Sequence, residues 1–500
     1  MLESLTSLVH GFGIALQPQN LLYCFIGVTM GTLVGVLPGI GPTATIALLL
    51  PATFTLNPIS AIIMLSGICY GAMYGGSTTS ILLNIPGEAS SVVTCFDGYQ
   101  MARQGRAGAA LGISAFGSFI AGTASIFGLI LLAPTLADFA LRFGPPEYFA
   151  LMVMGLTVVA YLARRSMAKA LMMAVFGILL GCIGLDPITA TPRFTFGILE
   201  LADGIGIAPV VMGLFGIAEV LENLGVVRKT EVFTEKIKGL FPDREDWKRS
   251  LGPIARGSLL GFFLGLLPGV GAIVPQFLSY ALEKKLSRHP ERFGNGAIEG
   301  VASPEACNNA AVGGTFIPLL SLGIPSTAMT AILLGALMIY GLTPGPLLIK
   351  NSPDLFWGVV ASMYIGNAML LILNLPLIPM WVRVLKIPYS YLSCFIILFC
   401  LIGAYSLNNS TTDIYIAVTF SLVGLLMKKF AFEPAPLVLA FVLGPLLETA
   451  LRRSLILSDG SVLIFLQRPI SAAFIIFSIG VLVAPLFSQI RLGRGLSEED

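Results

Sequence analysis

Long apolar runs alternate with short polar stretches along almost the whole chain of 500 residues. A membrane-spanning α-helix needs roughly 20 apolar residues, and several runs approach or reach that length. We expect helical segments at residues 21–37, 59–83, 107–133, 148–162, 168–185, 205–221, 257–282, 313–322, 328–342, 356–379, 392–405, 414–427, 437–447 and 470–487. Some of these are too short to cross a bilayer. The pattern therefore predicts an all-α polytopic membrane protein with about 10–12 transmembrane helices plus broken or re-entrant half-helices.

A charged stretch interrupts the apolar pattern near the middle of the chain. Residues 226–250 contain seven Lys or Arg and five Asp or Glu, which is too much charge for hydrocarbon. Clusters of Lys and Arg between apolar runs, as here and at residues 164–169, are typical of cytoplasmic loops. We predict a first membrane repeat at 1–225, a charged cytoplasmic linker at 226–250, and a second membrane repeat with extra C-terminal helices at 251–500. The charges do not fix the topology beyond residue 292.

Composition excludes several other classes of protein. Hydrophobic residues make up 56% of the chain and charged residues only 11%, against roughly 25% charged in a soluble domain. The net charge of +2 gives no basis for nucleic-acid binding. The seven Cys residues include no Cys-x-x-Cys pair, so they do not suggest a metal site. The chain has only two histidines, His10 and His289, which suggest neither a metal site nor a catalytic triad. We expect no enzymatic activity, no metal site, no cofactor and no removable signal peptide.

The two halves share a pattern of glycine and proline. The segment LPGIG, with Pro38, Gly39 and Gly41, recurs as LPGVG, with Pro268, Gly269 and Gly271, at a constant offset of 230 residues. A looser match pairs NIPGE, residues 84–88, with GIPST, residues 323–327, and aligning the preceding Gly-Gly pairs requires one inserted residue. Gly/Pro-interrupted apolar segments at corresponding positions indicate two internal repeats, as in secondary transporters. The pattern leaves inverted and parallel repeats equally open.

The repeated breaks are the candidate substrate site. Proline removes a backbone donor, and glycine permits non-helical backbone, so the helices should break there. A break inside the membrane exposes a half-helix N-terminus, where free N–H groups favour an anion such as a carboxylate. The alternatives are ordinary kinks, and hydroxyl groups that bond only their own helix. The candidate substrate-binding residues are Pro38, Gly39, Gly41, Thr43, Asn84, Pro86, Gly87, Pro268, Gly269, Gly271, Gly323, Pro325, Ser326 and Thr327.

A second candidate site lies in the polar segment 299–310, where carboxylates and amides adjoin apolar sequence without a basic neighbour. Ionisable groups at membrane depth are costly and usually functional. Glu305 is expected to bind a coupling cation or proton, with Asn308 one helical turn later on the same face. The alternative is a loop at the membrane surface, where a charged glutamate stays in water and has no desolvation cost. By contrast, Asp97, Glu219 and Glu448 are assigned no transport role.

These segments together resemble the large membrane subunit of the tripartite tricarboxylate transporters over essentially the full chain. The resemblance is carried by GTLVGVLPGIGPTATIALLLP from Gly31, YGGSTTSILLNIPGEASSVVTCFDGYQMARQGRAG from Tyr74, GFFLGLLPGVGA from Gly261, EGVASPEACNNAAVGG from Glu299 and LGIPSTAMTAILLGAL from Leu322. It places the family's paired Pro-Gly breaks at Pro38, Gly39, Gly41, Pro268, Gly269 and Gly271, and its acidic amide motif at Glu305, Asn308 and Asn309. One departure is Ser326, because the family pattern favours glycine at this position. This departure places citrate in doubt as the substrate.

The resemblance implies a multi-pass subunit of a secondary transporter in the bacterial inner membrane. Such a subunit would import a small carboxylate, a tricarboxylate such as citrate or a related acid, by symport with Na+ as the expected ion and H+ as the alternative. Its partners would be a small membrane subunit and a periplasmic solute-binding protein. The alternatives are another cargo, such as an amino acid, sugar acid or aromatic acid, and, from a different class, a channel or a membrane enzyme.

Overall fold

The computed structural model describes residues 2–37, 41–163, 166–186, 188–224, 239–271, 273–384 and 389–495. These residues are mainly helical, and their one strand pairing joins β1 (Gly184–Leu185) to β2 (Pro192–Arg193) in antiparallel register. Seven of the described helices are long and apolar enough to cross a membrane, and shorter apolar helices accompany them. The predicted fold class, an all-α polytopic membrane protein, is confirmed.

The chain divides into two compact units, and each unit draws on both halves of the sequence. Residues 1–138 and 206–426 form the first unit, and residues 139–205 and 427–500 form the second. The two compact units do not test the predicted repeats at 1–225 and 251–500. The repeats were inferred from duplicated sequence, whereas the units are defined by compactness. The repeat boundaries therefore stay a prediction.

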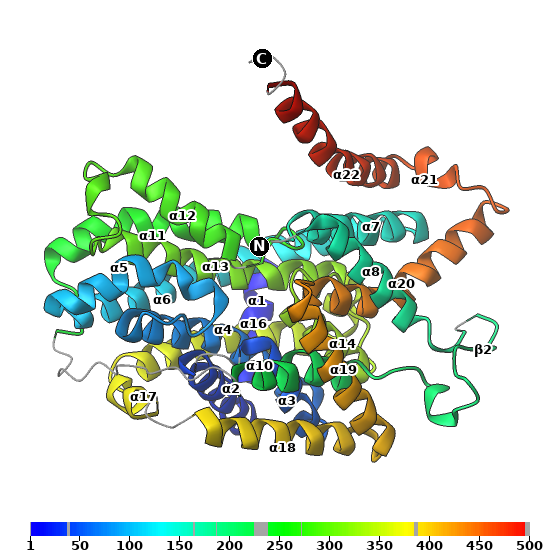
Figure 1. Ribbon diagram of the computed structural model, residues 1–500, viewed down its shortest axis with the longest axis horizontal. Coiled ribbons are helices and arrows are strands. Elements are labelled where there is room, and N and C mark those ends of the chain that lie inside the picture. Colours follow the sequence, from blue (N-terminus) through cyan, green and yellow to red (C-terminus); the bar gives the residue numbers. More distant parts are fainter. Residues whose placement is uncertain are drawn as a thin grey trace. The chain divides into compact units, whose positions relative to one another are not determined.

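The first unit contains the two candidate sites. Its elements are α1 (Leu2–Ala15), α2 (Pro18–Val36), α3 (Pro42–Thr53), α4 (Pro58–Leu83), η1 (Ala89–Val92), α5 (Thr94–Met101), η2 (Ala102–Arg106), α6 (Ala107–Ala140), α9 (Ile207–Val211), η4 (Met212–Ile217), α10 (Ala218–Leu224), α11 (Arg244–Gly265), α12 (Ile273–Leu286), η5 (Pro290–Arg292), α13 (Glu299–Leu322), α14 (Ala328–Ile339), α15 (Pro346–Asn351), α16 (Pro353–Asn374), α17 (Ile378–Val384), α18 (Tyr389–Asn408) and α19 (Thr411–Lys429). Several begin with proline at the first helical position, where the missing N–H removes no hydrogen bond. Helices α11, α12 and α13 lie side by side, and α5 contacts α13 (Figure 1).

The second unit consists of α7 (Pro145–Tyr161), α8 (Met167–Gly181), β1, β2, η3 (Leu199–Leu201), α20 (Pro434–Leu457), α21 (Ile464–Gln467) and α22 (Pro469–Gly495). Helix α20 packs on α7 and α8, and α22 packs on α7. An ion-pair cluster ties the strand pair to α20, since Arg193 bonds both oxygens of Glu448 and Arg452 bonds Asp186 and Glu448. Hydrogen bonds from the backbone N–H of Thr189, and then from Arg452, hold the pKa of Asp186 below its ordinary value. These contacts identify the cluster as a structural one.

Close helix pairs in the first unit explain the glycine spacing in both halves. Helix α2 packs along α4, and α11 packs along α13. An added Cβ at Gly31 would lie 2.6 Å from the carbonyl oxygen of Ile68, and one at Gly261 would lie 2.1 Å from that of Cys307. An added Cβ would also lie close to a carbonyl oxygen of the partner helix at the glycines one turn before and after these two, Gly27, Gly35, Gly257 and Gly265. Small residues at four-residue spacing let helix backbones touch in a membrane, so both halves use the same pairing.

The contacts also correct the alignment of the second repeated segment. A Cβ on Gly75 would meet the carbonyl oxygen of Thr32 at 2.2 Å, and one on Gly314 would meet that of Phe262 at 2.5 Å. Because Phe262 follows Thr32 by the same 230 residues, Gly75 corresponds to Gly314 rather than to Gly313. No inserted residue is needed. The adjacent Gly-Gly letters misled the alignment, since packing fixes which glycine faces the partner helix.

Several predicted boundaries differ from the structure. Helix α8 ends at Gly181, where the chain turns into β1, instead of running to residue 185. The span expected at 257–282 is two helices, α11 and α12, broken between them. Helix α11 begins at Arg244, inside the charged stretch, because the side chain of Asp243 accepts a hydrogen bond from the N–H of Asp246 and caps it. Helix α13 begins at Glu299, well before the expected start at residue 313.

Candidate functional site

The first pair of predicted breaks interrupts the helices at corresponding places. Helix α2 ends at Val36 and α3 begins at Pro42, with Gly41 before it at φ 67°. In the second half, α11 ends at Gly265 and α12 begins at Ile273, with Gly271 at φ 60°. Both glycines are in the left-handed region that other residues rarely adopt. Pro38 and Gly39 lie outside the described residues, and Pro268 and Gly269 lie in the turn between α11 and α12.

The second pair of breaks is also built alike in the two halves. Helix α4 ends at Leu83 and is followed by Asn84, with φ 56°, and α13 ends at Leu322 and is followed by Gly323, with φ 70°. Four residues later the chain starts a new helix, η1 after Glu88 and α14 after Thr327. The backbone N–H of Glu88 donates to the hydroxyl of Ser91 at 3.4 Å, just as that of Thr327 donates to Thr330 at 2.9 Å. Glu88 is therefore the counterpart of Thr327, and each residue precedes a helix N-terminus.

All four broken segments line one pocket of about 630 Å³. The first half contributes residues 41–44 and 84–90, and the second half contributes Gly271, Ile273 and residues 327–329. Met73, Phe215, Glu219, Asn223, Val312 and Thr315 complete the wall. The pocket thus joins segments that are more than 200 residues apart in sequence. Its described lining contains no Lys, Arg or His.

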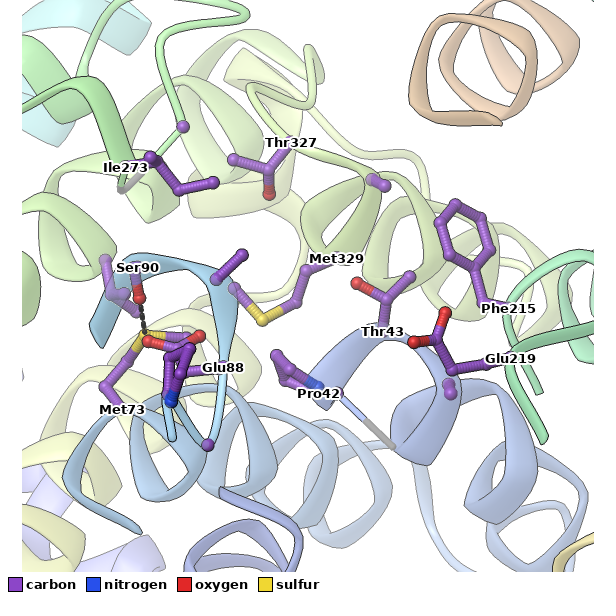
Figure 2. Close-up of a pocket in the computed structure, with 18 of the residues that line it drawn as sticks. Pro42, Thr43, Met73, Glu88, Ser90, Phe215, Glu219, Ile273, Thr327 and Met329 are labelled. Carbon is purple, nitrogen blue, oxygen red and sulfur yellow. Dashed lines mark hydrogen bonds between the residues drawn. The ribbon is translucent and has the colours of Figure 1, made fainter. Parts of the chain in front are cut away.

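Two carboxylates stand on opposite sides of this pocket. Figure 2 shows Glu88 near Met73 and Ser90 on one side, and Glu219 near Thr43 and Phe215 on the other. The π-helical segment η4 and the following α10 carry Phe215 and Glu219 to the wall. The sequence prediction did not single out Glu88, and it assigned no transport role to Glu219. Glu88 carries the signal that singled out Glu305, an acidic residue in apolar sequence without a basic neighbour.

Seven of the fourteen predicted substrate-binding residues line the pocket: Gly41, Thr43, Asn84, Pro86, Gly87, Gly271 and Thr327. Of the others that the structure describes, Gly323, Pro325 and Ser326 are packed around the break and are absent from the lining, as are Pro268 and Gly269. The backbone N–H of Gly269 donates to the carbonyl oxygen of Ser326 at 2.9 Å. That bond holds the two breaks of the second half together, which gives these residues a supporting position.

Glu305 is completely buried within α13, so the surface-loop alternative for this segment is wrong. Its Oε2 accepts a hydrogen bond of 2.5 Å from the hydroxyl of Ser77 on α4, and its Oε1 accepts one from Thr94 on α5. The amide of Asn309 donates to the hydroxyl of Ser118 on α6 at 2.7 Å. These contacts join α13 of the second half to three helices of the first.

Asn308 differs from its two neighbours because it is directed toward the pocket wall. Its Nδ2 donates to Glu88 Oε1 at 3.3 Å, and it shares one face of α13 with the lining residues Val312 and Thr315. Its Oδ1 is buried and has no hydrogen-bond partner in the described part of the chain. The structure therefore separates the predicted triplet into one residue that contacts the pocket-lining Glu88 and two that bond neighbouring helices.

The helix ends give the pocket two electrostatic regions. The N-termini of α3, α12 and α14 meet there, and unpaired N–H groups at such ends attract an anion. The other region holds Glu88, which follows the C-terminal end of α4. The arrangement can hold an anion and a cation near each other. The described residues contain no group of three or more His, Cys, Asp and Glu side chains that could hold a metal ion.

Asp97, which was assigned no transport role from sequence, is a buried anchor. Its Oδ1 accepts hydrogen bonds from the backbone N–H groups of Gly294, Gly296 and Ala297 at 2.8–2.9 Å, and its Oδ2 accepts one from the hydroxyl of Tyr280 at 2.8 Å. The carboxylate thereby holds the loop before α13 against α5. Sequence gave no signal, because all four donors lie far along the chain.

We expect Asp97→Asn to lower the free energy of unfolding by roughly 2–4 kcal/mol, because an amide loses one acceptor oxygen and the charge that strengthens these bonds. Thermal unfolding of the purified protein in detergent would measure it. Asp203→Asn, at an exposed carboxylate, is the matched control. Equal melting temperatures for both variants would show that the anchor contributes nothing.

Comparison with known proteins gives a consistent picture. The model of the family described as "Tripartite tricarboxylate transporter TctA family" matches residues 21–439. An "Uncharacterized 52.8 kDa protein in TAR-I ttuC' 3'region" of Agrobacterium vitis is 52% identical over 494 residues, which cover 99% of this chain and 98% of that protein. An "Uncharacterized protein in TAR-II ttuC' 3'region" of the same organism is 48% identical over 234 residues, 47% of this chain and 97% of its own length. No solved structure matches the chain.

Proposed function

This chain belongs to the tripartite tricarboxylate transporter TctA family, and on that premise we propose that it translocates a small carboxylate by cation symport in the bacterial inner membrane. Na+ is the expected coupling ion. A periplasmic solute-binding protein would deliver the acid, and a small membrane subunit would complete the transporter. Transport would proceed by alternating access between two states of the repeats.

The observation that carries this proposal is the pocket in which broken helices from both halves meet. Secondary transporters place substrate and coupling-ion sites where discontinuous helices of two repeats adjoin. Here the N-termini of α3, α12 and α14 supply backbone N–H groups to a carboxylate. Thr43 and Thr327 add hydroxyl groups beside two of those ends. The volume of about 630 Å³ accommodates a small organic acid together with water.

The charge of the lining supports coupling to a cation. A carboxylate substrate would enter a pocket whose described wall holds the carboxyl group of Glu88 and no Lys, Arg or His side chain. Like charges repel strongly in a low-dielectric site, so the bound acid requires a compensating positive charge. A cation or proton that enters with the acid supplies it. This requirement favours symport over uniport of the anion.

The proposal is tested by uptake of labelled citrate and a panel of other carboxylates into vesicles that contain both membrane subunits. The assay is run with and without the binding protein, and with and without a sodium gradient. We expect uptake of at least one acid to require both. Asn84→Ala should weaken the apparent affinity by roughly tenfold, because a lost polar contact costs about 1–1.5 kcal/mol. Saturable uptake that ignores every cation gradient would contradict the symport mechanism.

A further inference from the structure

We infer that Glu88 and Asn308 form a binding site for one dehydrated monovalent cation, sodium, in the wall of the pocket. The inference rests on the proposed symport function and names the site of the coupling ion. It retains Asn308 from the sequence-predicted residues and adds a carboxylate from the opposite half of the chain. The ligands come from a loop of the first half and a helix of the second, so the ion would bridge the two halves.

Glu88 is held in place at the pocket with most of its acceptor capacity open. It ends the unwound segment after α4, and an added Cβ on Gly76 would lie 2.7 Å from its Cγ, so its side chain rests directly against that glycine. Its carboxylate accepts one long hydrogen bond, 3.3 Å, from Asn308. Unwound backbone beyond a half-helix C-terminus is where transporters coordinate sodium. Glu88 is thus a fixed, partly exposed carboxyl group in such a position.

Asn308 supplies the second, independent observation. The residue is fully buried, and its carbonyl oxygen Oδ1 lacks a partner among the described residues. A buried acceptor left unsatisfied costs about 1–3 kcal/mol, which a structure tolerates where a ligand completes the bond. The amide nitrogen beside it already contacts Glu88. A cation between the Glu88 carboxylate and Oδ1 would satisfy both oxygens.

Glu305 is a poorer ligand although it is only one turn away. The hydroxyl groups of Ser77 and Thr94 already donate to its two oxygens, whereas Asn308 Oδ1 has no donor among the described residues. A cation would have to displace those donors. The positions that correspond to Glu88 and Asn308 in the opposite repeat contain no carboxylate. Thr327 occupies the position of Glu88 in the second half, and Cys69 occupies the position of Asn308 in the first half. The asymmetry predicts a single sodium ion at this place.

Binding of radioactive sodium to the purified full-length chain, without substrate and at constant ionic strength, tests the assignment. We expect Glu88→Gln and Asn308→Ala to weaken sodium binding by roughly 10- to 100-fold, the usual loss when a ligand or its support is removed. Asn308→Asp, which keeps an oxygen at the ligand position, is expected to retain binding. Glu219→Gln removes the same charge across the pocket and is expected to stay within about threefold of wild type.

The outcomes separate this site from the transport function. If wild type binds sodium and Glu88→Gln binds it equally well, the site is wrong while sodium-driven uptake stands. Equal losses in Glu219→Gln and Glu88→Gln would replace the specific site with a general effect of pocket charge and overturn the assignment. If wild type binds no sodium but takes up carboxylate on a proton gradient, the sodium site is overturned and symport remains. If it shows neither binding nor gradient-driven uptake, both proposals fail.

Discussion

Glu305→Ala is expected to lower the free energy of unfolding by roughly 3–5 kcal/mol, enough to deplete folded protein from the membrane. The change removes the acceptor for the buried hydroxyl groups of Ser77 and Thr94 and leaves a cavity beside them. Because these contacts join α13 to α4 and α5, their loss also loosens the connection between the two halves. Melting curves and the yield of monodisperse protein in detergent measure the effect.

Glu305→Gln is the matched variant, since it keeps the side-chain volume and one carbonyl oxygen. It is expected to retain most of the folded protein, because a hydroxyl can donate to that oxygen or accept from the new amide. Sodium binding by this variant tests the sequence prediction that Glu305 itself holds the coupling ion. Loss of binding with an intact fold would support that prediction. Retention would assign Glu305 to anchoring and leave the cation to Glu88.

Gly87→Ser is expected to abolish uptake. An added Cβ at Gly87 would lie 1.9 Å from the carbonyl oxygen of Gly35 and 2.8 Å from the Cα of Gly76, and neither backbone atom can rotate away. The loop would have to move off the α2–α4 pair, which displaces Asn84 and Glu88 from the pocket wall. Overpacking of this kind costs about 1–3 kcal/mol or more, and here the strain falls on the site itself.

The reciprocal change Ser326→Gly is the control at the corresponding break. Ser326 is 1% exposed, does not line the pocket, and its hydroxyl has no partner among the described residues, so its removal loses little. We expect substrate affinity to change less than about fivefold, which is under 1 kcal/mol. Uptake kinetics of both variants with the same acid provide the comparison. Active Gly87→Ser, or inactive Ser326→Gly, would contradict the packing argument.

The proposed site was partly accessible from sequence because a helix break is a local event. Proline and glycine act on the hydrogen bonds and backbone angles within a few residues, so their repetition predicted the breaks at residues 41 and 271 and at 84 and 323. Their convergence on one pocket was expected only by analogy with other transporters. Glu88 was not singled out and Glu219 was assigned no transport role, because neither local stretch indicates that the two side chains stand on opposite sides of a pocket.

The pattern of residues was sufficient to predict an all-α polytopic membrane protein with paired broken segments. Apolar length, charge placement and Pro-Gly breaks are each properties of short stretches, and the bilayer imposes helices on every apolar stretch that crosses it. Only the folded structure shows three further features: the division into two units, the correspondence of Gly75 with Gly314, and the anchoring of Asp97. It also separates Asn308, which contacts the pocket-lining Glu88, from Glu305 in the helix packing. Each depends on which distant backbone or side chain arrives as partner, and that is a property of helix packing rather than of any local stretch.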